Sequence, residues 1–318
     1  MKKFELSKLL SIIMLVVLIL LGSQLSDSFL SVRNFSNIIQ YSVETALISI
    51  GMALVLIIGG IDLSVGSVLA FSTVVSAKLA LAGVNTAVIL IVTIVIGFTV
   101  GAINGLLITK TKVEAFMATL GTMMVMRACT FLFTGGGPLT GSIKTSFQQI
   151  IKGKFLNVQY GIFYVIIMFV LAGIILSRTR FGRHVYAVGG GEETAKLFGV
   201  QVDKVKIAVY IISGILAALA GMIIAARIGI GEPRSGYGYE MIAITVCVVG
   251  GVSMTGGKGT VTGTFIGLMV ISIIKNLMNL MNIDTNAQPI VNGIIILIVA
   301  LIISREMLGK RKSLVKQI

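Results

Sequence analysis

The feature that most constrains this chain is a series of long apolar runs that follow one another along its whole length. A helix needs about 17 to 25 mostly apolar residues to cross a hydrocarbon core of roughly 30 Å. Ten runs approach that length, with boundaries near 9–26, 42–58, 63–82, 85–108, 114–133, 161–177, 207–227, 241–254, 260–281 and 288–304. Because a backbone in lipid must satisfy its hydrogen bonds internally, the sequence predicts an all-α, polytopic transmembrane bundle of about ten spans, formed as a single domain over residues 1–318.

The composition supports this fold class. Only 12% of the residues are charged and 56% are hydrophobic, whereas about a quarter of the residues in a soluble domain are charged. The 37 glycines, against three prolines, fit helices that pack closely in a membrane. Cys129 and Cys247 lie in predicted spans without the spacing of a disulfide or a metal site, so we expect packing roles for both and no metal in this chain.

The first and eighth runs differ from the others. The first follows Met1, Lys2 and Lys3 as in a signal peptide, but no cleavage motif comes after it, so we expect it to remain as a helix. The eighth, 241–254, is short, and is expected to be an interior helix that starts in the preceding glycine-rich stretch or tilts little.

The formal net charge of +14 has a membrane explanation. Most of the 26 lysines and arginines fall in loops that are cytoplasmic if the N-terminus is inside, as the positive-inside rule requires. We therefore expect both termini on the cytoplasmic side. The same bias accounts for most of the basic excess, so we expect no nucleic-acid partner.

Two loops are longer than a connection needs: an outer one at 135–160 and a cytoplasmic one at 178–206. The outer loop fits either a docking surface or an ordinary polar cap. In the cytoplasmic loop, residues 192–198 are expected to form a short helix that Gly199 stops in the left-handed conformation. Its first turn contains the acids Glu192 and Glu193, and Lys196 is placed to pair with Glu192 at i,i+4.

This short helix ends in two apolar residues, Leu197 and Phe198, that have no obvious place in lipid. A helix of two turns is not stable by itself and must dock on another surface. That surface is the protein's own bundle, the membrane surface or another protein, and the spacing of the residues leaves all three open.

Several motifs, taken together, resemble those of one family. They are the runs 34–38, 59–67, 104–107, 118–122, 181–200 and 250–259, which include Gly-Gly-Ile-Asp-Leu-Ser and Gly-Gly-Gly-Glu-Glu. In this order and spacing they resemble permease subunits of ABC importers of the ribose and branched-chain amino acid family, and especially its monosaccharide branch. Gly191 stands where the family usually has Asn, and Ala115 where it often has Pro. Glycine is still an accepted N-cap, so the short helix is expected to form.

The resemblance implies a function and partners. The chain would be the permease subunit that forms the path of a monosaccharide through the bacterial cytoplasmic membrane. Its partners would be a second permease subunit, an extracytoplasmic solute-binding protein, and an ATPase subunit that carries the ATP and magnesium. The loop 178–206 would dock on the ATPase through Glu192, Glu193, Lys196, Leu197, Phe198 and Gly199. A branched-chain amino acid or a nucleoside remains an alternative solute.

The chain itself has no phosphate-binding loop. Its nearest match, 251–259, has Gly259 where a serine or threonine must hold magnesium, and so reads better as a turn at the membrane edge. The segments 59–66 and 250–257 share the pattern Gly-Gly-x-x-apolar-hydroxyl-x-Gly, which predicts a weak internal repeat. The turn residues of the two segments are Gly59, Gly60, Asp62, Gly250, Gly251 and Gly256.

A path for a neutral polyol needs weak hydrogen bonds spread along it. The candidates inside predicted spans are Glu44, Asn104, Thr119, Thr122, Thr245 and Asn276, although such side chains also join helices to one another. For Glu44 the alternatives are a solute contact, a place at the outer edge, and an ion pair with Arg127 or Lys275. Asp62 is expected to cap the third span.

Other functional classes fit less well. An intramembrane serine protease needs a histidine at membrane depth, but the only histidine, His184, lies in the cytoplasmic loop. An intramembrane aspartyl protease needs two facing acids, and only Asp62 lies outside the loops. We therefore expect a transport subunit without enzymatic activity. A self-contained channel or secondary transporter would have the same spans, but would leave the helix near Glu192 unexplained.

Overall fold

The computed structural model describes residues 2–143 and 145–284, and after them residues 287, 288, 290, 291, 293, 294 and 297. The described elements are, in order, α1 (Lys2–Leu25), α2 (Val32–Gln40), α3 (Val43–Ile57), α4 (Val65–Leu81), α5 (Thr86–Lys110), α6 (Ala115–Thr134), α7 (Thr145–Lys152), β1 (Lys154–Phe155), β2 (Val158–Gln159), α8 (Tyr160–Arg178), α9 (Arg180–Gly190), α10 (Glu192–Leu197), α11 (Val202–Ile228), α12 (Tyr239–Val249) and α13 (Val261–Leu280). The prediction of a helical membrane protein is confirmed.

The first nine apolar runs all form helices. Five of them, α5, α6, α8, α11 and α13, are long and apolar enough to cross a membrane, and α2 with α3 adds a sixth candidate bent by 50°. Three shorter apolar helices are Ser11–Leu25 within α1, α4 and α12. The tenth run, 288–304, lies mostly outside the described residues, so the number of ten spans stays a prediction.

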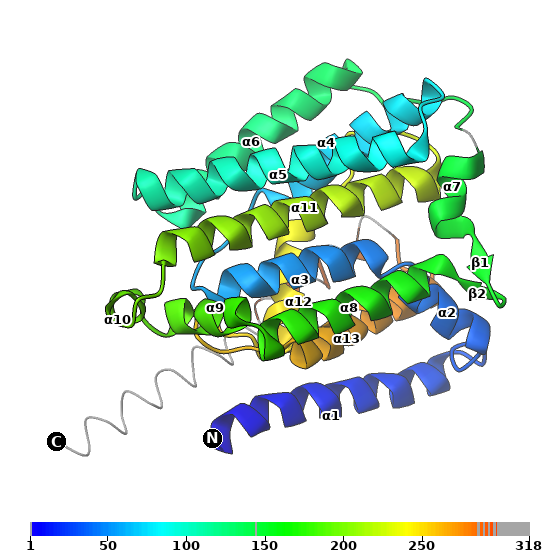
Figure 1. Ribbon diagram of the computed structural model, residues 1–318. Helices are drawn as coiled ribbons and strands as arrows, with labels where there is room; N and C mark the ends of the chain where they lie inside the picture. Colours follow the sequence, from blue (N-terminus) through cyan, green and yellow to red (C-terminus); the bar gives the residue numbers. More distant parts are fainter. Residues whose placement is uncertain are drawn as a thin grey trace.

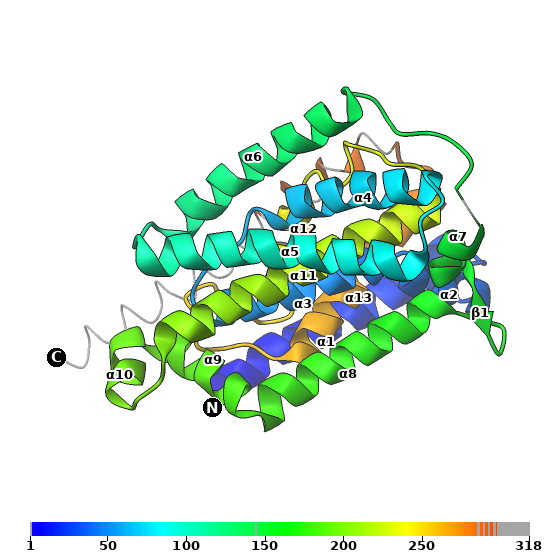
Figure 2. The ribbon, with the colours of Figure 1, turned by 45° about the horizontal axis from the view of Figure 1, so that its top comes forward.

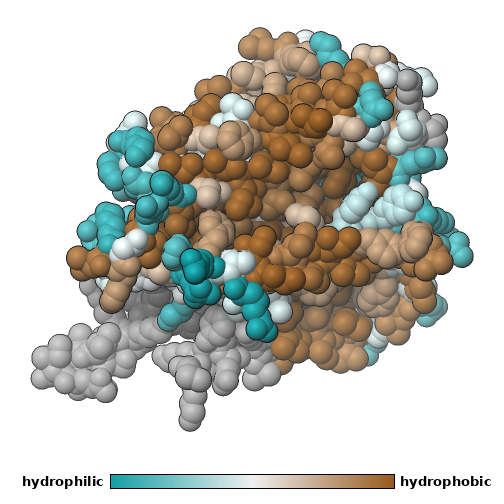
Figure 3. Space-filling model, in the orientation of Figure 1, coloured by the Kyte–Doolittle hydropathy of each residue, from teal (hydrophilic) through white to brown (hydrophobic). Residues whose placement is uncertain are grey.

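The long helices lie side by side, with α11 in the middle (Figure 1). It packs most extensively against α5, and then against α4 and α3, and it is the most buried of the five long helices. The helix α6 is the least buried and lies on the outside of the layer formed by α4 and α5 (Figure 2). On the face shown in Figure 3 the surface is apolar along the middle of the helices and polar at their two ends. This distribution suits a bundle embedded in lipid.

Glycines allow α5 and α11 to approach closely. Gly97, Gly101 and Gly105 are spaced by four residues, so they lie on one face of α5. A Cβ atom at Gly101 would lie 2.7 Å from the Cα atom of Ile211, and one at Gly97 would lie 2.5 Å from the Cα atom of Ile215. Backbone contact of this kind is how helices pack in lipid, where burial of apolar surface supplies little driving force.

Three helices were not predicted. Residues 180–190, expected to be loop, form α9, which begins where the Thr179 hydroxyl accepts a hydrogen bond from the Gly182 amide at 3.1 Å. The outer loop contains α7, which buries Phe147 and Ile151, and the small antiparallel hairpin β1–β2. The third, α2, precedes α3. All three are short and amphipathic, so the apolar length that identifies a span does not reveal them.

Candidate coupling surface and polar groups of the bundle

The helix α10 projects from the end of the molecule where α1 begins, beside α9 (Figure 1). Gly191 precedes it, and Ala195 is its one buried residue. The helix ends at Leu197, and Gly199 takes a φ of +79°, so the expected left-handed stop is confirmed. Phe198, predicted as the last helical residue, is instead the residue that follows the helix.

The charges of α10 pair differently from the prediction. Lys196 bonds to Glu193 at 2.8 Å, whereas Glu192 pairs with Lys206 of α11. The predicted Glu192–Lys196 pair is therefore wrong, because the first turn of α10 lies against α11 and Glu192 points to that helix. The hydrogen bond to Lys196 lowers the pKa of Glu193, and the same bond raises the pKa of Lys196. Since both side chains are exposed to solvent, water screens this pair and it stabilises the helix little.

The two apolar residues at the end of α10 point into solvent. The exposed fractions are 87% for Leu197 and 83% for Phe198. The described part of the bundle therefore does not cover them, which removes one of the three docking surfaces left open by the sequence. A cavity of about 220 Å³ lies beside α10, between it and the turn after α3, and its lining includes Gly59, Gly60, Lys112, Glu114, Glu192 and Lys206.

Asp62 is the centre of a buried group of polar side chains. One carboxylate oxygen accepts hydrogen bonds from the amide and the hydroxyl of Ser64, at 3.0 and 2.6 Å, and the other accepts one from the Ser213 hydroxyl of α11 at 2.8 Å. Asp62 therefore stabilises the start of α4, as a cap does, but it stands two residues before the N-cap Ser64. It also ties α4 to α11, which the sequence did not reveal.

Two of the predicted pathway residues, Asn104 and Thr122, extend this group. The Asn104 amide donates to the Ser64 hydroxyl at 2.9 Å and its oxygen accepts from the Thr122 hydroxyl at 2.6 Å. The Thr119 hydroxyl donates to the Ala115 carbonyl at 2.8 Å, within α6. These bonds link α4, α5 and α6 in the interior, and Asn104 and Thr119 are fully buried.

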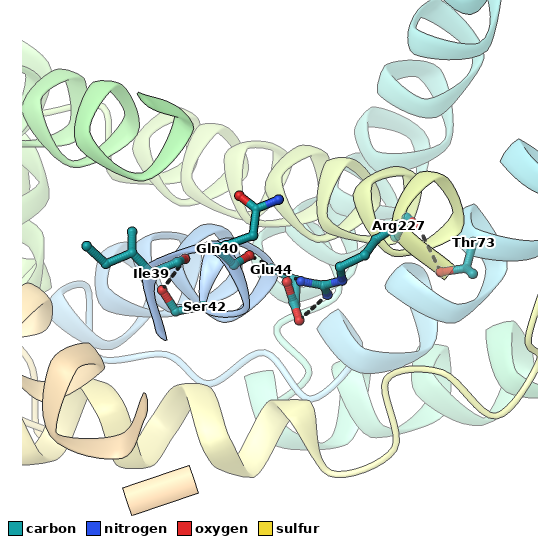
Figure 4. Close-up of polar contacts among 7 residues, drawn as sticks. Ile39, Gln40, Ser42, Glu44, Thr73 and Arg227 are labelled. Atoms are coloured by element: carbon teal, nitrogen blue, oxygen red, sulfur yellow. Dashed lines mark hydrogen bonds and ion pairs between the residues drawn. The ribbon is translucent and has the colours of Figure 1, made fainter. Parts of the chain in front are cut away.

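Glu44 forms an ion pair with Arg227, near the end of α11 (Figure 4). The predicted partners, Arg127 and Lys275, are wrong. The Arg227 guanidinium also donates to the Gln40 carbonyl at 3.2 Å and lies 5.3 Å from the centre of the Tyr41 ring. The pair is almost entirely buried, so it fixes α11 to α3 and to the end of α2, where the two bent helices meet.

The other two pathway candidates also bond within the protein. The Thr245 hydroxyl donates to the Met241 carbonyl of its own helix at 2.8 Å. Asn276 exchanges two amide hydrogen bonds with Asn34, at 2.9 and 3.1 Å, which joins α13 to α2. Each of the six candidates therefore bonds to another group of the protein, and a solute contact for them stays a prediction.

The two predicted turns have the same local geometry but a different alignment. After α3 the Gly59 and Gly60 amides donate to Leu56 and Val55, and after α12 the Gly251 and Val252 amides donate to Val248 and Cys247, all at 2.9 Å. Gly59 and Gly251 both have a φ of +81°. Gly59 therefore corresponds to Gly251 and not to Gly250, which shifts the proposed repeat by one residue. Gly250 instead packs against Gly263, and Gly256 has a φ of +82°.

Sequence reasoning missed two residues of these groups. Ser213 and Arg227 contact the predicted acids from α11, and only the large number of polar residues in apolar runs hinted at such contacts. Within the described ranges there is no group of three or more His, Cys, Asp or Glu side chains that could hold a metal ion.

Comparisons with known proteins match this chain to one family of permeases. The family model described as the permease component of the branched-chain amino acid transport system matches residues 34–300. The ribose import permease of Haemophilus influenzae is 39% identical over 95% of this chain and 94% of its own length, and that of Bacillus subtilis is 39% identical over 91% and 90%. The L-arabinose ABC transporter permease of Azospirillum brasilense is 34% identical over 86% and 80%. No solved structure matches the chain. The chain therefore belongs to the family of ABC importer permeases that includes these sugar permeases.

Proposed function

We propose that this chain is the membrane-spanning subunit of an ATP-binding-cassette importer for a monosaccharide, with ribose or a related pentose as the first solute to test. Support comes from relatives that carry the names of ribose and L-arabinose permeases and that match this chain over most of its length. These names favour a sugar over a branched-chain amino acid or a nucleoside. A separate ATPase subunit supplies the energy, and this chain supplies the path.

The observation that carries the proposal is the exposure of Leu197, at the end of α10, and of Phe198, which follows it. The other side of this helix contacts the bundle. Ala195 is buried and Glu192 is paired with Lys206, so α10 is anchored to α11. Two large apolar residues on such a rigid support suit insertion into a cleft of another protein. A self-contained channel would not need two exposed apolar side chains at this position.

The remaining partners follow from the same class of transporter. A second permease subunit completes the path, and an extracytoplasmic binding protein delivers the sugar in the bacterial cytoplasmic membrane. In this proposal both termini lie in the cytoplasm, together with α9 and α10. Closure of the ATPase subunits can change the conformation of the bundle only through contacts that differ between its states, and α10 is the proposed contact.

Co-purification with the ATPase subunit tests the proposal. The double variant Leu197→Ala, Phe198→Ala is expected to bind the ATPase about 10- to 100-fold more weakly, as expected for the loss of anchor residues. The control is Leu132→Ala on α6, because Leu132 is also 83% exposed but lies in an apolar span. It is expected to leave ATPase binding unchanged.

Uptake of labelled ribose by vesicles that contain the whole complex is the second readout. The double variant is expected to lose uptake, and the control to retain it. Undiminished co-purification of the ATPase with the double variant would remove α10 as the coupling element. Uptake of ribose without any ATPase would favour a secondary transporter.

A further inference from the structure

The segment between α11 and α12, residues 229–238, enters the molecule from its outer end without forming a helix. Gly231 pairs with Leu139 through two backbone hydrogen bonds of 2.9 Å and lies against Val74 and Ala77 of α4. Gly236 lies against Gly66, in the first turn of α4. Since α4 rises about 1.5 Å per residue, the segment descends roughly 12 to 16 Å along it. Residues 231–238 are called the descending segment below.

An arginine from α6 holds the lower end of the descending segment. The Arg127 guanidinium donates to the Ser235 carbonyl at 3.0 Å and to the Gly236 carbonyl at 3.5 Å, and it lies 4.0 Å from the centre of the Tyr237 ring. Arg127 is twelve residues after the start of α6, so it is about 18 Å along that helix, well inside a bilayer core of roughly 30 Å. It is a charged residue at membrane depth.

A half-buried acid lies next to this arginine. Glu240, in the first turn of α12, lies close enough to Arg127 for the two charges to interact. In the described part of the chain the two side chains form no ion pair. The Oε2 atom of Glu240 is buried beside Gly66 of α4 and has no hydrogen-bond partner there. A buried acceptor without a partner costs stability, so it suggests a ligand.

The exposed side of this region is unsuited to lipid. Arg234 is exposed, Ser235 and Gly238 are half-buried, and Tyr237 has an exposed fraction of 58%. Irregular backbone at membrane depth is tolerated only where protein or water covers it, and charged side chains at that depth mark solute or ion pathways.

We propose that the descending segment, with Arg127, Tyr237 and Glu240, lines the aqueous pathway and contacts the hydroxyl groups of the sugar. This inference rests on the proposed function. The guanidinium has donors left over, the carboxylate accepts, and the phenol does both, which suits vicinal hydroxyls. The free face of the Tyr237 ring offers an apolar surface to the C–H groups of a sugar ring. Few and distributed contacts of this kind let the solute leave again.

Cysteine accessibility tests whether water reaches the segment. Tyr237→Cys is compared with Ile91→Cys on α5, because Ile91 is 61% exposed and so matches Tyr237 in exposure. Both are made with Cys129 replaced by alanine, while Cys247 is fully buried and is retained. The complete transporter in proteoliposomes is treated with a charged, membrane-impermeant methanethiosulfonate reagent.

Because only an ionised thiol reacts, Tyr237→Cys is expected to react at least about tenfold faster than Ile91→Cys, and saturating ribose is expected to slow it. Equal and slow reaction at the two positions would overturn the inference, whether lipid or a second copy of the chain covers Tyr237. This outcome is separate from failure of the proposed function, because the reaction needs no transport. Ribose uptake by the parent protein is measured in parallel.

A second measurement tests the solute contact itself. Glu240→Gln is expected to raise the ribose concentration for half-maximal uptake several-fold, while the maximal rate and the co-purifying ATPase change little. A loss of maximal rate at unchanged half-saturation would assign Glu240 to the structure of the segment and would overturn its role as a sugar contact.

Discussion

Among single side chains, Asp62 has the most demanding environment, because it accepts three hydrogen bonds in the interior. In Asp62→Asn one oxygen becomes an amide nitrogen, which cannot accept from Ser64 or Ser213. We expect the variant to fold with a free energy of unfolding lowered by about 1 to 3 kcal/mol, the usual cost of a buried donor without a partner. Thermal unfolding of the purified protein in detergent measures this.

Asp203→Asn is the matched control for Asp62→Asn. Asp203 forms a largely exposed ion pair with Lys110 at 3.5 Å, so its loss is expected to cost at most about 1 kcal/mol. If Asp62→Asn unfolds at the same temperature as the parent and yet abolishes uptake, Asp62 contacts the solute and its structural role is wrong.

Glu44 illustrates what the sequence could and could not predict about a residue. An acid in an apolar run must have a partner, so an ion pair was among the predictions. The partner, Arg227, is 183 residues away and was not named, because no periodicity links one helix to another. Burial makes this pair costly to break, since a single buried charge would remain. Candidate acids were therefore predictable, but their contacts were not.

Among the helices, the contact of α5 with α11 depends on glycine. Gly101→Ala would place a methyl group against the backbone of α11, 2.7 Å from the Cα atom of Ile211. We expect this overpacking to destabilise the protein by about 1 to 3 kcal/mol, seen as a lower unfolding temperature and lower yield.

Gly121→Ala on α6 is the control, because a Cβ atom there meets nothing within 4 Å. Alanine favours a helix over glycine by up to about 1 kcal/mol, so this variant is expected to match or exceed the parent in stability. Equal destabilisation by the two substitutions would contradict the prediction, because only the Cβ atom at Gly101 would meet the backbone of another helix.

The helices that the sequence predicted are those with long apolar runs, because the thickness of the membrane sets the length of such runs. The helices that it missed, α2, α7 and α9, depend on tertiary contacts, as short helices do. α7 buries Phe147 and Ile151 against the bundle, and α9 buries Val185 and Val188. In α10 the stop at Gly199 was predictable from local sequence, whereas the pairing of Glu192 with Lys206 depends on how α10 packs against α11.

In the protein as a unit, α11 connects the polar groups described above. Near its N-terminus Lys206 pairs with Glu192 of α10, in its middle Ser213 bonds to Asp62, and near its C-terminus Arg227 pairs with Glu44. A displacement of α10 by a docked ATPase would therefore act on the same helix that fixes α3 and the start of α4. This arrangement gives the proposed coupling a continuous and rigid element.

The proposed orientation in the membrane can be tested with one residue before α8 and one residue after it. Leu156 in the turn of the β1–β2 hairpin is 80% exposed, and Leu197 at the end of α10 is 87% exposed. The hairpin and α10 lie at opposite ends of the molecule (Figure 1). Between them α8 has 19 residues, about 29 Å of helix, which matches one crossing of a core of roughly 30 Å. With Cys129 replaced by alanine, Leu156→Cys is expected to react with an impermeant maleimide in intact spheroplasts, and Leu197→Cys only after permeabilisation. Reaction of both from the outside would mean that α8 does not span the membrane, and it would place α10 where no ATPase can reach it.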